Sequence, residues 1–399
     1  MAGAAASLAA CGGKFTSTDK VAKPERCDTL SPASQAPGQA QAKPITAIAC
    51  RVMSDLDLRS AIIQVSIGGR LIYSAALGES APGVPATTDM HFRNGAIAMT
   101  YMSTVLLQLV DENRLSLSDK VAGWIAGLPA ADKVTLEMLV NHTSGYPDYV
   151  ADPGFVAATK ADPLREWTAG GLLSYAFNKD LIYAPGSNWN YSHTNYLVLG
   201  AVIEKVTGKP LAEVIRERIL EPLRLRNTAS SVTPEIPSPV LRAYTSERSS
   251  YEESTFWNPS WTLPEGAVMT TDIADLRVSA EAIMSGRLLS PASFSAQTDA
   301  RLVGAGDPAA CPSGICRKNT EVAHYGLGLL VSGPWLMQSP LFGGYSAAIG
   351  MLPERKISIA VAATQGPNAD PDRNGSEALM LAISRHVAPD RPVPLSDAM

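Results

Sequence analysis

Alternating apolar and polar residues predict β-strands near both ends of the chain. Two strand-like runs, Ala61–Ile67 and Arg70–Leu77, flank Gly68-Gly69, and this arrangement predicts a β-hairpin. A helical pattern precedes them, from Ile45 to Ser60. Near the other end, the pattern predicts three more strands and a closing helix: Tyr325–Val331, Ala347–Leu352, Ile357–Ala363 and Ser376–His386.

The middle of the chain has helical rather than strand-like spacing. In FRNGAIAMTY, residues 92–101, a turn-forming lead-in precedes a helix whose apolar residues Met102, Val105 and Leu109 repeat at helical spacing. Further helices are predicted between Pro/Gly-rich loops: Thr135–Asn141, Ser192–Thr207, Leu211–Leu220 (ending before Pro222) and Asp272–Ser285. Strands at both ends around a helical middle predict an α/β lobe from residues 46–90 and 320–388, with an all-helical lobe, residues 91–319, inserted.

The composition is that of a globular protein with a sizeable core. Its 399 residues are 46% hydrophobic and 18% charged, which is enough for two structural lobes. The net charge of −5 and the lack of a Lys/Arg run argue against a nucleic-acid partner or an anionic membrane surface. No stretch reaches the roughly 18 apolar residues of a membrane-spanning helix. Residues 12–45, rich in Ala, Gln, Pro, Ser and Thr, are predicted to be a flexible tether, and residues 389–399 a disordered tail.

The N-terminus resembles the end of a bacterial lipoprotein signal. Leu8-Ala9-Ala10-Cys11-Gly12 matches a lipobox, in which Cys11 would be lipidated and become the first mature residue. Residues 1–11 are then a truncated signal segment, and the protein is exported and held at the cell envelope by a lipid on Cys11. The apolar stretch is short and lacks a basic lead-in, so an accidental match in an Ala-rich start stays open.

The cysteine count favours the same compartment. Five cysteines are an odd number, and removing Cys11 leaves Cys27, Cys50, Cys311 and Cys316, enough for two disulfides under oxidising conditions. Cys311 and Cys316 can close a short loop, and Cys27 with Cys50 can tie the tether to the body. Four free thiols are the alternative. No CxxC or HxxxH spacing accompanies them, so neither a metal site nor a cofactor is predicted.

Four segments, in this order, resemble the serine β-lactamase-related family, which includes class C β-lactamases, D-alanyl-D-alanine carboxypeptidases and related esterases. The segments are Asp89–Trp124, Thr135–Tyr149, Ala184–Thr228 and Gly266–Leu276. The resemblance covers roughly residues 46–388 and implies an antiparallel-sheet α/β lobe formed by both termini, with an inserted helical lobe.

The family's nucleophile and base are replaced in this sequence. Members carry Ser-x-x-Lys at a helix start, where the serine is acylated and the lysine one turn later takes or relays its proton. The resemblance places this cluster on Ala96-Ile97-Ala98-Met99. Ala96 has no heteroatom and the Met99 thioether cannot take up a proton. Sliding the register to Ser103 gives Ser-Thr-Val-Leu, which has no lysine.

The family's two other clusters are partly retained. A Tyr-x-Asn type triplet falls on Tyr191-Ser192-His193, where tyrosine is kept and His193 still offers a donor or acceptor. A Lys-Thr-Gly or His-x-Gly triplet matches best on Phe342-Gly343-Gly344, which keeps the ligand-approaching glycine as Gly344 but loses the polar head. The loop from Gly333 to Leu341 could shift this second match by a residue or two.

Three further residues have two open interpretations. Trp257, in the loop FWNPSW, would lie at the cleft rim in the family arrangement, where it either stacks on a ligand or covers the core. His142 and Ser144, in NHTSGYPDY, suggest a catalytic triad, but in family members this block is structural and Ser144 shapes a turn.

Three hypotheses for function follow. The first is a catalytically inactive, envelope-tethered homologue that keeps its cleft for a peptidoglycan fragment or an envelope protein. The second is an enzyme of esterase, carboxypeptidase or β-lactamase type that uses a non-family nucleophile, with Tyr191 or His193 as base. The third is a scaffold whose cleft has collapsed around Met99 and Phe342.

Overall fold

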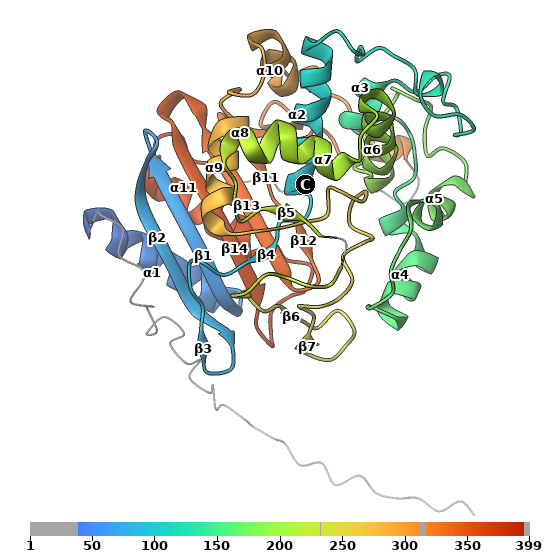
Figure 1. Cartoon of the computed structure of the whole chain (residues 1–399). Helices are drawn as coiled ribbons and strands as arrows, with labels where there is room; N and C mark the ends of the chain where they lie inside the picture. The colour runs from blue at the N-terminus through green and yellow to red at the C-terminus, as the bar shows by residue number, and fades with distance from the viewer. Residues whose placement is uncertain (1–38, 232, 312–315, 395–399) are drawn as a thin grey trace, which may run out of the picture.

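A nine-stranded sheet forms one side of the molecule (Figure 1). The computed structural model describes residues 39–231, 233–311 and 316–394. The strand order is β3-β2-β1-β14-β13-β11-β10-β9, with β12 paired to β13, and the pairings are antiparallel. The strands are β1 Leu58–Ile67, β2 Arg70–Ala81, β3 Val84–Pro85, β9 Ala323–Tyr325, β10 Leu330–Ser332, β11 Trp335–Gln338, β12 Leu341–Phe342, β13 Tyr345–Leu352 and β14 Ile357–Gln365.

The two ends of the chain meet in this sheet, as the sequence predicts. The predicted hairpin is formed by β1 and β2, and Gly68 and Gly69 turn the chain with φ of 62° and 76°. Strand β1 also pairs with β14, so that Ile62 lies opposite Ala362. The antiparallel α/β lobe built from both termini is therefore confirmed.

Helices cover both faces of the sheet. Helices α1 (Gln39–Asp55) and α11 (Gly375–Val387) pack on one face, and α9 (Ile273–Ile283) packs on the other. Successive residues of β14 alternate between the two layers: Ile359 joins the core under α1 and α11, whereas Ala360 joins the core under α9. Because β14 is buried on both faces, its middle, Ile359–Ala363, is a continuous apolar run instead of an alternating one.

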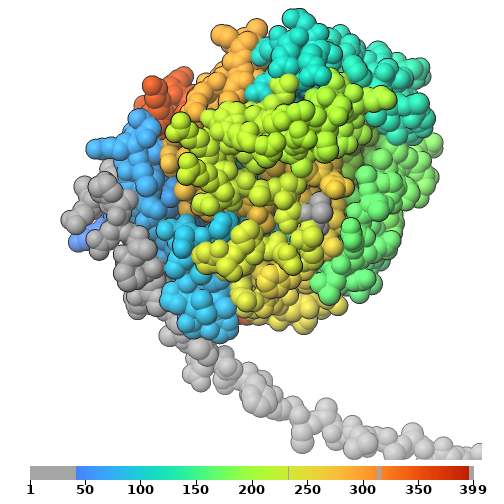
Figure 2. All heavy atoms as spheres, in the orientation of Figure 1, coloured from blue at the N-terminus to red at the C-terminus, as the bar shows by residue number. Residues whose placement is uncertain are grey.

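The inserted region lies beside the sheet and is mainly helical (Figure 1). In the face shown in Figure 2, its green and yellow atoms lie next to the blue N-terminal hairpin. Its helices are α2 Ile97–Asp111, α3 Leu136–Val140, α4 Pro153–Ala161, α5 Ala169–Phe177, α6 His193–Thr207, α7 Leu211–Ile215, α8 Glu221–Leu223 and α10 Pro291–Thr298. The region is not all-helical, because it also contains the small sheets β4-β8-β5 and β6-β7. These strands are β4 Phe92–Arg93, β5 Ala229–Ser230, β6 Tyr244–Thr245, β7 Glu252–Glu253 and β8 Met269–Thr271.

Several boundaries differ from the sequence-based prediction. The predicted strand Tyr325–Val331 is two strands, β9 and β10, which pair with each other around a turn. The predicted helix Leu211–Leu220 continues past Pro222, through a π-helical segment into α8. Pro222 is tolerated because it lies in the first turn of α8. In both cases the apolar pattern continues through the boundary, once through a tight turn and once through a π-helical segment, so the pattern alone does not mark where the element ends.

The predicted tether and tail are shorter than expected. Helix α1 begins at Gln39, inside the segment 12–45, and it ends at Asp55 because Leu58 already enters β1. At the other end, Val393 is buried and the indole N–H of Trp335 donates to the carbonyl of Arg391 at 2.8 Å. Residues 392–394 are therefore packed on the body, contrary to the expected disorder from 389, whereas residues 389–391 are exposed and residues 395–399 lie outside the described ranges.

The described cysteines are disulfide-bonded, which agrees with an oxidising environment. Cys311 and Cys316 form a disulfide, as predicted. Cys50 is disulfide-bonded as well, and its expected partner Cys27 lies outside the described residues, as does Cys11. Among the helices of the described ranges, none is long and apolar enough to cross a membrane.

The turn between β12 and β13 depends on two adjacent glycines. Gly343 and Gly344 have φ of 53° and 79°, a conformation that L-residues disfavour. A Cβ atom on Gly344 would overlap the carbonyl oxygen of Tyr244, whereas one on Gly343 would come no closer than 3.8 Å, to the ring of Trp257. Gly344 is thus required by close backbone packing against Tyr244, and its expected role in letting a ligand approach the strand stays a prediction.

His142 joins α3 to the start of α6. It follows α3 with φ of 65°, and its Nδ1 accepts the backbone N–H of Ser192 at 3.2 Å. The imidazole is fully buried, 4.4 Å from the ring of Tyr191 and 4.8 Å from that of Tyr325, centre to centre. Burial lowers the pKa of His142 well below its usual value, and nearby His193 lowers it further. His142 is therefore neutral and holds Tyr191 in place.

We expect the two turn glycines to respond differently to alanine. Gly343→Ala introduces only the cost of a left-handed residue, about 1 kcal/mol. Gly344→Ala adds the overlap with the Tyr244 carbonyl, which brings the loss of unfolding free energy to about 3 kcal/mol. Urea denaturation followed by circular dichroism measures both values, and equal losses would contradict the proposed packing role of Gly344.

The buried His142 should make stability pH-dependent. Because its pKa is lower in the folded than in the unfolded state, the unfolded chain binds the extra proton and folding stability falls as the pH drops below about 6.5. Asparagine also tolerates the positive φ of this position. Between pH 7.5 and pH 5.0, the free energy of unfolding should therefore fall by about 2 kcal/mol less in His142→Asn than in the wild type. An unchanged pH dependence in the variant would show that His142 does not carry this effect.

Candidate functional site

The start of helix α2 faces a pocket of about 240 Å³. Ala96, the residue before the helix, is partly buried and lines this pocket. It has φ of −65° and ψ of 0° and makes no side-chain capping hydrogen bond. The methyl group of Ala96 therefore occupies the place in the cleft where the family resemblance puts a serine hydroxyl.

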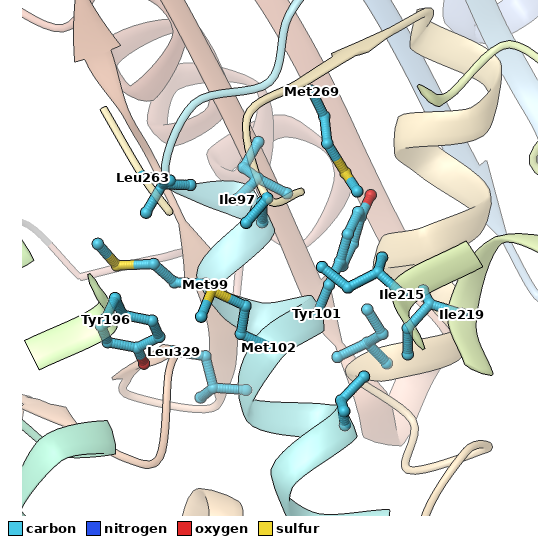
Figure 3. Packing of buried hydrophobic residues seen from close by; sticks show 14 of the residues in the cluster. Ile97, Met99, Tyr101, Met102, Tyr196, Ile215, Ile219, Leu263, Met269 and Leu329 are labelled. Atoms are coloured by element: carbon cyan, nitrogen blue, oxygen red, sulfur yellow. The ribbon is translucent and has the colours of Figure 1, made fainter. Parts of the chain in front are cut away.

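Met99 lies one turn further along α2 and is fully buried. Figure 3 shows its side chain on the same side of the helix as Tyr196 and Leu329, within the core. The hydroxyl of Tyr191 donates a hydrogen bond to the Met99 sulfur at 2.9 Å. A thioether takes the place of an ammonium group here, so the tyrosine hydroxyl faces a weak, uncharged acceptor.

Tyr191 precedes α6 and reaches the same pocket. Burial raises its pKa well above the usual value, and nearby Tyr325 and Asp148 raise it further. The phenol is therefore protonated at neutral pH and acts as a hydrogen-bond donor. No positive charge in the described contacts of Tyr191 offsets this effect, so the residue is a poor general base as it stands.

His193 is the first residue of α6 and forms a pair with Asp148. Its Nδ1 lies 3.1 Å from Asp148 Oδ2, and its backbone N–H donates to Asp148 Oδ1 at 3.0 Å. Asp148 also caps the short helix Tyr149–Ala151 by accepting the N–H of Val150. His193 lines the pocket, and its Nε2 has no hydrogen-bond partner within the described part of the chain. Sequence reasoning found His193 and missed Asp148, although both lie in segments that resemble the family.

Gln338 takes the third position at the pocket. It ends β11, and its side-chain amide donates to the carbonyl of Ala96 at 3.3 Å. The expected residue was Phe342, which lines the same pocket but lies on β12, beyond Ser339 and Pro340. Phe342 therefore packs at the pocket edge against Gly95, while Gln338 is the residue that forms the hydrogen bond to Ala96. A glutamine that ends the apolar strand WLMQ was the sequence signal that could have identified this position.

A second cavity, of about 420 Å³, adjoins this pocket. Val150, Trp261 and Phe342 line both. The rings of Trp261 and Phe342 meet edge to face, with 6.3 Å between their centres, and separate the two spaces. Trp257 lines the larger cavity and is only partly buried, but it does not line the pocket at the start of α2.

The hydroxyls near the pocket are directed elsewhere. Ser339 donates to Glu377 Oε2 at 2.7 Å, and Thr262 donates to the carbonyl of Pro259 at 2.8 Å. Two other candidate serines are fully buried: Ser103 donates to the carbonyl of Leu327, and Ser144 donates to Asn195. None of these hydrogen bonds goes to His193, so they form no Ser-His pair with it. Within the described ranges, no group of three or more His, Cys, Asp or Glu side chains is placed to hold a metal ion.

Comparison with known sequences identifies the family. The family described as Beta-lactamase matches residues 45–383. The chain is 30% identical over 174 residues to penicillin-binding protein 4 of Amycolatopsis lactamdurans, covering 40% of each chain. It is 31% identical over 154 residues to a putative D-alanyl-D-alanine carboxypeptidase of Escherichia coli K12, covering 36% of this chain and 35% of the relative. These alignments thus span well under half of either relative.

Solved structures share the whole fold. A D-stereospecific amidohydrolase from Streptomyces superposes with a TM-score of 0.71 at 27% identity, over 86% of this chain and 98% of that one. D-amino acid amidase from Ochrobactrum anthropi SV3 superposes with a TM-score of 0.70 at 22% identity, over 86% and 99% of the two chains. With the family match across most of its length, the chain belongs to the Beta-lactamase family of serine hydrolase-fold proteins.

Proposed function

We propose that this protein is a member of the family that binds ligands in its cleft without forming an acyl-enzyme. The observation that carries the proposal is the pair Ala96 and Met99 at the start of α2, beside a pocket that is still open. Acyl transfer needs a nucleophilic oxygen and a group that takes its proton, and these two side chains offer neither. Because nucleophile and base act as a unit, losing the nucleophile alone removes most of the covalent route.

No nearby hydroxyl replaces the missing nucleophile in this proposal. Ser339 and Thr262 line the pocket, but their hydrogens point to Glu377 and to a backbone carbonyl. Tyr191 points to the Met99 sulfur, and its raised pKa keeps it protonated. A serine becomes a nucleophile when an adjacent base accepts its proton. Among the described residues, Thr262 has no such base, and the only one beside Ser339 is the Glu377 carboxylate, not the lysine or imidazole that activates serines in acyl transfer.

The open space argues for binding over a collapsed scaffold. Met99 and Phe342 do not fill the cleft, since a pocket of about 240 Å³ remains beside Ala96 and a cavity of about 420 Å³ adjoins it. Spaces of this combined size and with aromatic walls suit a small ligand or a peptide side chain. A peptidoglycan fragment or an envelope protein is the proposed ligand, in line with relatives named as penicillin-binding proteins and carboxypeptidases.

The same relatives support an exported protein at the cell envelope. The disulfide between Cys311 and Cys316 fits an oxidising compartment. Attachment through a lipid on Cys11 completes the proposal. Mass spectrometry of the N-terminal peptide from membrane-fractionated cells would show a diacylglyceryl group on Cys11, and an unmodified Cys11 would exclude the anchor.

Restoring two side chains should restore acylation. We expect fluorescent penicillin to leave the wild type unlabelled. The double variant Ala96→Ser/Met99→Lys should become covalently labelled, because its serine hydroxyl would face the pocket and its lysine amine would lie beside Tyr191. Labelling is measured on denaturing gels and by intact mass. Ala96→Ser alone is the matched control and should label at least about 100-fold more slowly, since it lacks the base. Labelling of the wild type would overturn the proposal.

A second candidate function is direct hydrolysis with the Asp148–His193 pair as general base. The pair favours it because Asp148 fixes the imidazole through Nδ1 and leaves Nε2 at the pocket. In such a reaction, Nε2 takes a proton from a water molecule that attacks the substrate carbonyl. The same proton then passes to the leaving group, so that no covalent enzyme intermediate forms.

Ester turnover separates the two candidates. If the pair is catalytic, saturable hydrolysis of p-nitrophenyl acetate should fall about 100-fold in His193→Gln and also fall in Asp148→Asn. His386→Gln is the control for non-specific imidazole reactivity, because His386 belongs to α11 on the opposite face of the sheet. Non-saturable background that is unchanged in His193→Gln would exclude this candidate.

A further inference from the structure

The larger cavity next to the pocket has a lining that selects for charge. We infer that the 420 Å³ cavity binds a positively charged ammonium group on an apolar body, with Glu247 as its charge partner. This inference rests on the proposed binding function and names the class of ligand that the cleft takes. The first family cluster does not form its wall, since neither Ala96 nor Met99 lines this cavity.

Aromatic rings form much of the cavity wall. They are Phe155, Trp167, Trp257, Trp261, Phe342 and Tyr345. The faces of such rings attract cations, and the effect is strongest for tryptophan. Two of them already have a guanidinium group nearby: Arg165 lies 4.1 Å from the centre of the Trp167 ring, and Arg248 lies 6.0 Å from that of Trp257. An apolar ligand body with a cationic head group therefore fits this wall.

Glu247 brings a carboxyl group into the same cavity. Its Oε1 accepts a hydrogen bond from the Thr245 hydroxyl at 3.3 Å, but it forms no ion pair among the described residues. The two arginines that flank it in sequence are paired with other carboxylates, Arg242 with Glu253 and Arg248 with Glu252. Glu247 therefore lacks the counter-charge that a partly buried carboxylate normally has.

The protonation of Glu247 reflects the same lack of a partner. Burial raises its pKa, and the Thr245 hydrogen bond and a backbone hydrogen bond from Gly343 lower it by less. The neighbouring Asp372 raises the pKa further, an effect larger than the opposing one of Lys160. A ligand ammonium group would favour the charged form, so that ligand binding and ionisation of Glu247 support each other.

The other charged groups of the cavity leave this preference in place. Asp162 and Asp372 add two exposed carboxylates at the rim, against the exposed ammonium of Lys160. Arg93 is almost fully buried, and its guanidinium donates to the carbonyls of Ser231, Thr233 and Glu235. Three of the five N–H donors of Arg93 are thus bound to backbone carbonyls, which leaves two for a ligand carboxylate.

Three small probes with the same aryl group test the inference. Phenethylamine is cationic at pH 7.5, 2-phenylethanol is neutral and 3-phenylpropionate is anionic. Titrations of the full chain, followed by ligand-observed NMR and by tryptophan fluorescence, should give a dissociation constant about tenfold lower for phenethylamine than for 2-phenylethanol. In Glu247→Gln this difference should disappear, while 2-phenylethanol binds as before and shows that the cavity is intact.

Glu265→Gln is the charge-matched control, since it removes one exposed carboxylate outside the cavity, and it should keep the preference for phenethylamine. Equal binding of phenethylamine and 2-phenylethanol, or tighter binding of 3-phenylpropionate, would overturn the inference and leave the binding function standing. If none of the three probes binds, both the inference and the binding function lose their support. A preference that survives Glu247→Gln would contradict the role of Glu247.

Discussion

The burial of helix α2 is the constraint on which the rest of the structure depends. Twelve of its residues are buried, and the helix is in contact with α6, α7, α9 and α10. A helix that is apolar on all sides must be covered on all sides, which requires both the inserted region and the layer of α9 against the sheet. At its N-terminal end, Ala96, the residue before the helix, lines the pocket, and at its other end Asp111 is exposed. The chemistry of the cleft therefore depends on very few positions of this helix.

Three polar groups around the start of α2 carry no charge. Tyr191 donates to a sulfur atom, and His142 is neutral among aromatic rings. Gln338 uses its amide to bond the carbonyl of Ala96. A buried lysine or arginine would need partners able to accept several hydrogen bonds, and none of these groups supplies a negative charge. The groups that contact Ala96 and Met99 are thus uncharged, while the carboxyl of Asp148 pairs with His193 at the pocket and that of Glu247 lies in the neighbouring cavity.

Much of the fold follows from local patterns in the sequence. The hairpin turns at Gly68-Gly69 as predicted. Helices α3 and α6 begin within one or two residues of their predicted starts, α3 after the capping residue Thr135 and α6 after Ser192, which makes no capping hydrogen bond. Their signals are local: glycines at left-handed positions, a capping residue and an apolar period. The prediction was wrong where a local pattern had two solutions, as in Tyr325–Val331, whose apolar residues are divided between β9 and β10. It was also wrong for Val393, whose burial depends on a surface formed by residues distant in sequence.

The sequence by itself determined the family-like order of segments, the meeting of both termini in one sheet, and the absence of a serine and a lysine at the start of α2. These properties depend on residue identity and on short-range spacing. Only the tertiary structure decided that Asp148 pairs with His193. It also decided that Gln338, and not Phe342, forms the hydrogen bond to Ala96. The contact of Gly344 with the Tyr244 backbone is a third such case. Each of these contacts joins residues from separate elements, and its distance depends on how the whole chain packs. The lack of an ion pair at Glu247 among the described residues also depends on the tertiary structure. The sequence places Arg242 and Arg248 near Glu247, and only the fold pairs these arginines with Glu253 and Glu252.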